Sequence, residues 1–168
     1  MKILYQDLLN FLAEKPTKDL LSEKLFQLGH EHEIDGDIFE MELTPNRGDC
    51  LSLIGLSRDL AVFFGKSNSI ELFDGDIEPL EINFENLSPK DCPKISFLEI
   101  EIEESVAEYK SYLENYFNTI GGNKNNLFTD ISNYISYELG QPTHCYDRES
   151  IKAKLTFENR KCNSTFKT

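Results

Sequence analysis

The stretch Phe39-Glu-Met-Glu-Leu-Thr-Pro-Asn-Arg-Gly-Asp-Cys-Leu-Ser-Leu-Ile-Gly-Leu-Ser-Arg-Asp-Leu-Ala61 predicts a strand, a turn and a helix in that order. Apolar residues alternate with glutamates over residues 38–43, which is typical of a half-buried strand. Residues 44–48 have the proline, asparagine and glycine of a turn. Asp49 is then expected to cap a helix that continues to Phe64 and ends at Gly65. The N-terminal part of the chain is therefore expected to mix helix and strand.

Two amphipathic helices are predicted before this stretch. The first covers residues 5–13, and the second follows Thr17, which has a side chain suited to capping. Gly29 is expected to end the second helix in a left-handed conformation. The leucines that define the two apolar faces recur at helical spacing and are Leu8, Leu9, Leu12, Leu21, Leu25 and Leu28.

The remainder of the chain predicts a second structural unit. Residues 67–91 form an acidic, linker-like stretch with one short alternating segment at 80–84. Strands are expected at 95–102 and from residue 155, and helices at 106–119 and 130–139, the latter ended by Gly140. The predicted class is α+β, with a small helical and β N-terminal domain (1–66), a linker (67–91) and a mixed α/β domain (92–168).

The charge of the chain limits its partners. Seventeen basic and thirty acidic residues give a net charge of −13. Because neutralisation of phosphates supplies most nonspecific affinity for nucleic acid, a broad RNA-binding surface is not expected. No apolar run is long enough to cross a membrane and the N-terminus lacks a cleavage signal, so we expect a cytoplasmic protein without membrane contact.

No metal site is expected from the sequence. The four cysteines are far apart and form no CxxC pair. His30 and His32 point the same way if they lie on a strand, but no third ligand is close in the sequence, so the pair is interpreted as part of a solvated strand.

Two sequence blocks carry a resemblance to a known family. Residues 39–61 resemble the TPNRxDCLSxxGxARE signature of the β subunit of bacterial phenylalanyl-tRNA synthetase. Asp130-Ile-Ser-Asn-Tyr-Ile-Ser-Tyr-Glu-Leu-Gly-Gln-Pro-Thr-His-Cys-Tyr-Asp147 resembles the DxTNYxxxExGQPxHAFD block of its editing domain, which Cys92-Pro93 opens. Ser132 replaces the usual threonine, and Cys145-Tyr146 replaces Ala-Phe.

The resemblance implies an N-terminal domain that lacks one insertion. In the family an OB-fold tRNA-binding domain follows the second helix, whereas here Gly29 is followed within ten residues by Ile38. The chain is also expected to be an N-terminal fragment that ends within the first part of the editing domain.

The resemblance further implies an editing site that hydrolyses tyrosyl-tRNA(Phe). A pocket selected for phenylalanine cannot strongly reject a substrate that adds only a hydroxyl, so a second hydrolytic site improves fidelity. His144 is carried over as the catalytic candidate that orients water or contacts the hydroxyl, and Ser132 and Asn133 as substrate-binding residues. The alternatives are that Ser132 and Asn133 satisfy backbone groups near a helix start and that His144 is structural.

The predicted function is that of a part of the phenylalanine–tRNA ligase β subunit, contributing to assembly and to editing. The family's aminoacylation centre lies in the catalytic α subunit, the expected partner, so ATP and Mg²⁺ belong to the parent enzyme and no cofactor is expected in this chain. Charged tRNA(Phe) is expected to bind weakly. The alternatives are a non-catalytic assembly module and a free-standing editing hydrolase. Arg47 could contact RNA, but an ion pair with Asp49 or Asp59 is favoured.

Overall fold

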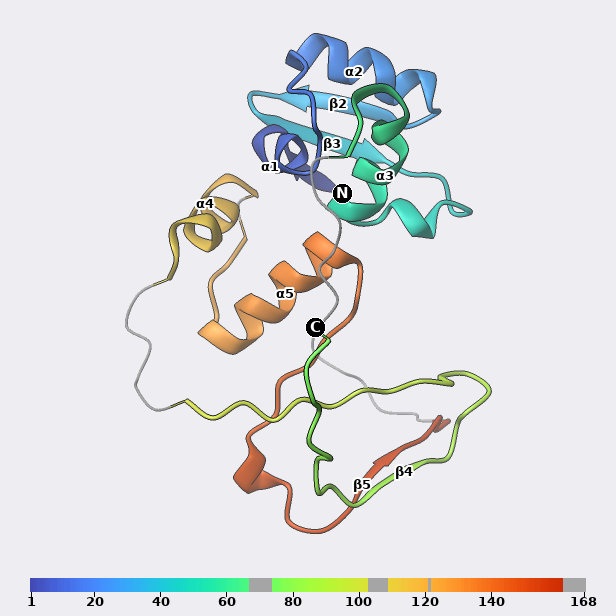
Figure 1. Ribbon diagram of the computed structural model, residues 1–168, viewed down its shortest axis with the longest axis vertical. Helices are drawn as coiled ribbons and strands as arrows, with labels where there is room; N and C mark the ends of the chain where they lie inside the picture. Colours follow the sequence, from blue (N-terminus) through green and yellow to red (C-terminus); the bar gives the residue numbers. More distant parts are fainter. Residues whose placement is uncertain (67–73, 103–108, 121, 162–168) are drawn as a thin grey trace. The chain divides into compact units, whose positions relative to one another are not determined.

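The computed structural model describes residues 1–66, 74–102, 109–120 and 122–161 (Figure 1). Two compact units are present: Met1–Leu72 with Val106–Cys145, and Phe73–Ser105 with Tyr146–Thr168. Helices and small sheets occur together, in agreement with the predicted α+β class. The predicted division into 1–66, 67–91 and 92–168 stays a prediction. Within the described ranges, no helix has the length and apolar composition needed to cross a membrane.

The first unit contains an antiparallel three-stranded sheet with the order β1-β3-β2. Its strands are β1 (Lys2–Leu4), β2 (Glu31–Asp35) and β3 (Ile38–Glu42). Gly36, with φ at 57°, lies in the two-residue turn that joins β2 to β3. Phe39 pairs with Ile3 on one side and Ile34 on the other, and is fully buried. The strand predicted at 38–43 is thereby confirmed.

Helices α1 (Tyr5–Asn10), α2 (Lys18–Gln27) and α3 (Leu53–Phe64) gather around this sheet (Figure 1). The predicted cap of α2 is confirmed, because the Thr17 hydroxyl accepts a hydrogen bond from the Leu20 N–H. Gly29 follows α2 with φ at 81°, as expected. The first helix is shorter than the predicted 5–13.

The predicted cap of α3 at Asp49 is wrong. Residues Gly48–Cys50 form a separate 3-10 turn, and α3 begins only after Ser52. Ser52 has an extended backbone and its hydroxyl accepts from the Gly55 N–H at 3.0 Å. The predicted end of the helix at Gly65 is confirmed. The carboxylate of Asp49 is instead engaged by arginines, which leaves the serine to cap the helix.

Two further helices belong to the same unit: α4 (Ser111–Ile120) and α5 (Leu127–Leu139). The start predicted for α4 at residues 106–108 lies outside the described residues. The helix expected from residue 130 begins earlier, because Asn126 caps it, while Gly140 ends it as predicted with φ at 72°. Asp130 is fully buried, and its carboxylate accepts hydrogen bonds from the Asn125 N–H and the Tyr109 hydroxyl. The hydrogen bond between Tyr109 and Asp130 raises the pKa of Tyr109 to about 12.

One hydrophobic core joins all of these elements. It unites residues from β1, the helices α1 to α5 and β3, with leucines as its main component. Its fully or almost fully buried members include Ile3, Leu8, Leu12, Leu21, Leu25, Phe39, Met41, Leu53, Leu56, Leu60, Leu113, Tyr116, Phe117 and Tyr137.

The second unit contains a parallel pair of short strands, β4 (Phe84–Asn86) and β5 (Leu155–Phe157), and a 3-10 turn at Arg148–Ser150. The strand predicted from residue 155 is confirmed. The alternating segment 80–84 overlaps β4 only at Phe84. The strand predicted at 95–102 is wrong, because no strand forms there. Alternation favours a strand only where a neighbour pairs with it, and none of the described segments does so here.

Candidate functional site

The segment after α5 runs back along that helix, and every second one of its residues makes a hydrogen bond to the helix. The Ser136 hydroxyl donates to the Gln141 carbonyl at 3.1 Å. Ser132 donates to the Thr143 carbonyl, and the hydroxyls of the two residues lie 2.8 Å apart. The Cys145 thiol contacts the Phe128 carbonyl at 3.5 Å. Residues 141, 143 and 145 therefore fix the path of the chain on either side of His144.

The three predicted site residues have different surroundings. Ser132 is buried, and its hydroxyl is used to hold Thr143. His144 is exposed and, among the residues that the structure describes, has no hydrogen-bond partner. Asn133, the next residue of α5, is exposed. No contact joins Ser132, Asn133 and His144 into one cluster within the described ranges, and their predicted roles stay predictions.

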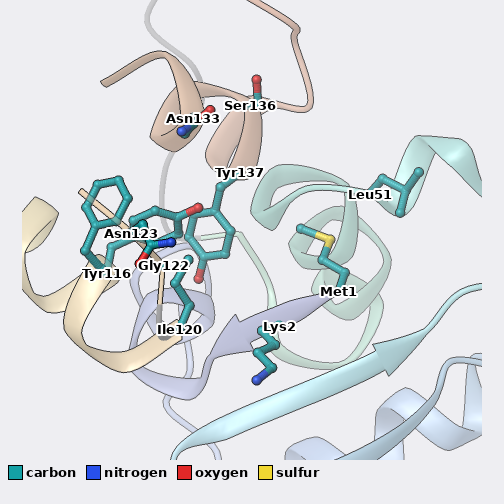
Figure 2. A pocket seen from close by; sticks show the side chains of 11 residues that line it. Met1, Lys2, Leu51, Tyr116, Ile120, Gly122, Asn123, Asn133, Ser136 and Tyr137 are labelled. Carbon is teal, nitrogen blue, oxygen red and sulfur yellow. The ribbon is translucent and has the colours of Figure 1, made fainter. Parts of the chain in front are cut away.

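Asn133 lines an open pocket of about 570 Å³ in the first unit. Figure 2 shows the Tyr137 ring between Met1 and Tyr116, with Asn133 and Ser136 projecting from α5. The other lining residues are Lys2 of β1, Leu51 between the 3-10 turn and α3, Phe117 and Ile120 of α4, and Gly122 and Asn123 after α4. Aromatic walls and a few amide and hydroxyl groups are common in pockets that take small organic groups.

Tyr137 connects α5 to the N-terminus. Its hydroxyl accepts from the Leu4 N–H at 3.1 Å and donates to the Asp7 carboxylate at 2.9 Å. Burial raises the pKa of Asp7, and the tyrosine's hydrogen bond only partly opposes this. Nothing in the sequence spacing of Tyr137 indicates its partner, which lies 130 residues away.

A second polar cluster surrounds Arg47. Its guanidinium binds Asp49 through Nε at 3.0 Å and also binds Asp59, so the predicted ion pair is confirmed with both candidates. Arg58 pairs with the same two carboxylates. Because hydrogen bonds from both arginines favour its ionised form, the pKa of Asp49 lies well below its ordinary range.

His30 lies beneath this cluster, and its interpretation as a solvated residue is wrong. Its imidazole is only 2% exposed, and Nε2 lies 3.1 Å from the Asp59 carboxylate. The buried Cys50 thiol is close to both. Burial, aided by the charge of Asp59, raises the pKa of Cys50 to about 11. Burial alone would raise the pKa of Asp59, but hydrogen bonds from Arg47 and His30 outweigh it and keep that pKa low.

His32 is also buried, so it too departs from the solvated interpretation. Its Nε2 lies 2.8 Å from the Ser22 hydroxyl and its Nδ1 lies 3.0 Å from the His30 carbonyl. Because a carbonyl only accepts, Nδ1 carries the proton of the neutral ring, and in that tautomer the Ser22 hydroxyl donates to Nε2. The ring stacks on Phe26, with centroids 4.3 Å apart. His30 and His32 thus face different partners and do not act as a pair.

Comparison with known protein families finds a match in the C-terminal part of the chain. Residues 91–168 match the model of the B3/4 domain. No solved structure matches the chain significantly. The C-terminal part of the chain is thus similar to a B3/4 domain.

Curated relatives extend the match to most of the chain. Proteins named phenylalanine–tRNA ligase beta subunit are 29% identical over 134 residues in Fusobacterium nucleatum, 35% over 127 in Rickettsia conorii and 33% over 133 in Bdellovibrio bacteriovorus. These matches cover 78, 73 and 75% of this chain but 17, 15 and 16% of the relatives. The chain is homologous to the bacterial phenylalanine–tRNA ligase β subunit, and it spans about a sixth of the length of the relatives that it matches.

Proposed function

We propose that this chain works as part of a phenylalanine–tRNA ligase β subunit and contributes to its assembly with the catalytic α subunit. The observation that carries the proposal is homology to β subunits over about three quarters of the chain, together with the B3/4 match. The proposed partner is the α subunit, and the proposed place of action is the cytoplasm.

We further propose that His144 serves an editing site that hydrolyses tyrosyl-tRNA(Phe). The support is the resemblance of residues 130–147 to the editing block and the exposure of the imidazole on a segment held at residues 141, 143 and 145. An exposed neutral imidazole can orient or polarise a water molecule near pH 7. Asn133 would contact the substrate, and Ser132 would act through its hold on Thr143. Charged tRNA would bind weakly, since the chain carries a charge of −13.

A specific observation favours the non-catalytic assembly role as the second candidate. The Ser132 hydroxyl is engaged, and among the described residues no carboxylate or carbonyl orients the His144 ring. A general base is usually oriented by a partner on its second nitrogen. A chain that only supports the subunit would need the packing of α5 but not the chemistry of His144.

The experiment combines binding with hydrolysis. Purified chain is mixed with the α subunit from the same source, and complex formation is followed by size-exclusion chromatography. Release of labelled tyrosine from tyrosyl-tRNA(Phe) is then measured under single-turnover conditions. If His144 serves editing, His144→Ala should slow release by more than about tenfold, or about 1.4 kcal/mol. Tyr146→Phe, at an exposed side chain two positions along the chain, is the matched control.

The outcomes separate the candidates. Binding without hydrolysis supports the assembly module, and hydrolysis that needs no α subunit supports a free-standing editing enzyme. If the chain neither binds the α subunit nor releases tyrosine, the proposed function is wrong. If a folded His144→Ala variant releases tyrosine at the parent rate, His144 is not part of the site.

A further inference from the structure

We propose that His30, Cys50 and Asp59 form a zinc-binding site with three protein ligands. The proposal does not depend on the function proposed above. Among the residues that the structure describes, only this group of histidine, cysteine and carboxylate side chains has three ligand atoms close enough to hold a metal ion. The fold collects them from the segment before β2, the 3-10 turn and α3.

The distances between the ligand atoms fit Zn²⁺. His30 Nε2 and Asp59 Oδ2 are 3.1 Å apart, Cys50 Sγ and Asp59 Oδ2 are 3.6 Å apart, and Cys50 Sγ and His30 Nε2 are 4.0 Å apart. A point equidistant from three atoms at these separations lies about 2.1 Å from each, and Zn²⁺ bonds measure about 2.0–2.2 Å to nitrogen or oxygen and about 2.3 Å to sulfur. An ion slightly out of the ligand plane meets all three requirements without a change in the backbone.

The ligand set and its burial also suit zinc. Nitrogen, sulfur and oxygen donors together are typical of Zn²⁺ and unlike the all-oxygen sets of Ca²⁺ or Mg²⁺. His30 is 2% exposed, Cys50 is fully buried and the Asp59 side chain is 16% exposed. Binding forms bonds to Nε2, Sγ and Oδ2. The thiol proton goes to solvent, the Nε2 proton that is now donated to Asp59 moves to Nδ1 by a change of tautomer, and water takes the fourth position. The resulting Zn²⁺, thiolate and carboxylate have no net charge.

Arg47 competes with the ion for this site. Its Nη2 contacts the Asp59 carboxylate and lies 2.7 Å from the Cys50 sulfur. The positively charged guanidinium is therefore already in contact with two of the three ligands. The same guanidinium binds Asp49 through Nε at 3.0 Å, and its side chain is 30% exposed. Arg47 can therefore keep Asp49 and turn away from the ligands when zinc binds. Removal of Arg47 should strengthen zinc binding, whereas a purely structural role of the cluster predicts no such gain.

The test uses the untagged chain. After treatment with a chelator, it is titrated with Zn²⁺, with bound metal measured after desalting, and with Co²⁺, whose near-ultraviolet charge-transfer band reports a thiolate ligand. We expect about one ion per chain and the thiolate band. Cys50→Ser should weaken binding by at least about tenfold, while Cys145→Ser, at an exposed cysteine, should leave it unchanged. Arg47→Ala should bind zinc more tightly than the parent.

A variant with Cys92, Cys145 and Cys162 all replaced by serine keeps the test decisive if Cys50→Ser does not fold. This variant, in which Cys50 is the sole cysteine, should still bind one ion and show the band. The proposal is overturned if the parent chain holds no zinc, if the variant with Cys50 alone shows no thiolate band, or if Arg47→Ala binds zinc no better than the parent.

Discussion

Replacement of Tyr137 by phenylalanine tests how α5 is attached to the N-terminal strand. The substitution keeps the ring, which packs against Tyr116 with centroids 4.6 Å apart, and removes only the hydroxyl. That hydroxyl is the acceptor of the Leu4 N–H and a donor to Asp7. Without it, the buried Leu4 N–H has no acceptor and the carboxylate loses a donor.

The expected loss is about 2–4 kcal/mol in the free energy of unfolding. A buried donor left without a partner costs about 1–3 kcal/mol, and a hydrogen bond to a charged group contributes about 1.5–3 kcal/mol. The two are not fully additive because Asp7 is only partly buried and regains contact with water. For a chain of this length, the corresponding fall in Tm is about 5–15 °C.

The measurement is urea or thermal unfolding followed by circular dichroism. Tyr112→Phe is the matched control, since Tyr112 is 48% exposed and among the described residues its hydroxyl makes no hydrogen bond. The control should change stability by less than about 0.5 kcal/mol. Equal effects of the two substitutions would refute the idea that the Tyr137 hydroxyl holds α5 to the N-terminus.

Three further predictions concern single side chains. Asp7→Asn should be more stabilising at pH 7 than at pH 4 in urea unfolding. Burial raises the folded-state pKa of Asp7 above 3.8, so the stability that the protonated Asp7 side chain contributes is fully present below that value and is lost as the pH rises through the folded-state pKa. An equal effect of the substitution at both pH values would contradict this. Gly55→Ala should cost about 3 kcal/mol or prevent folding, because the new Cβ would lie 2.0 Å from the Asp49 carbonyl oxygen, whereas Gly48→Ala meets nothing and should be tolerated in the same thermal scan. Ser52→Ala should lower the free energy of unfolding by about 1 kcal/mol through loss of the cap of α3, and a neutral result would mean that another group caps the helix.

Local patterns were enough to predict several elements of the fold. Thr17 before an amphipathic run gave the start of α2, Gly140 gave the end of α5, and the alternation at 38–43 gave β3. These signals depend on residues within one or two turns of each other. The prediction of Asp49 as the cap of α3 was wrong because the cap depends on where the Asp49 carboxylate finds charged partners. The strand at 95–102 was wrong because pairing with a neighbour, which no local pattern reveals, decides strand formation.

The candidate sites show still more clearly that local sequence patterns do not reveal contacts between distant residues. The sequence separates His30 from Cys50 by 20 positions and Cys50 from Asp59 by 9, and this spacing matches no metal-binding pattern. Only the packing of α3 against the segment before β2 brings the three side chains together. Likewise, Ser132 was singled out from the block that contains it, but the engagement of its hydroxyl depends on Thr143, which lies 11 residues further on.

The geometry of α5 limits how an editing substrate could use the three predicted residues. Successive side chains on a helix differ by about 100° in direction, so Asn133 cannot share the environment of Ser132. Asn133 lines the open pocket, while Ser132 holds Thr143 on the side where the returning segment carries His144. Ser136, one turn after Ser132, both lines this pocket and holds Gln141, so in the proposed editing role the substrate would lie where the open pocket meets the returning segment. In the proposed editing role, Ser132 acts on the substrate only through Thr143, by fixing the segment that carries the histidine.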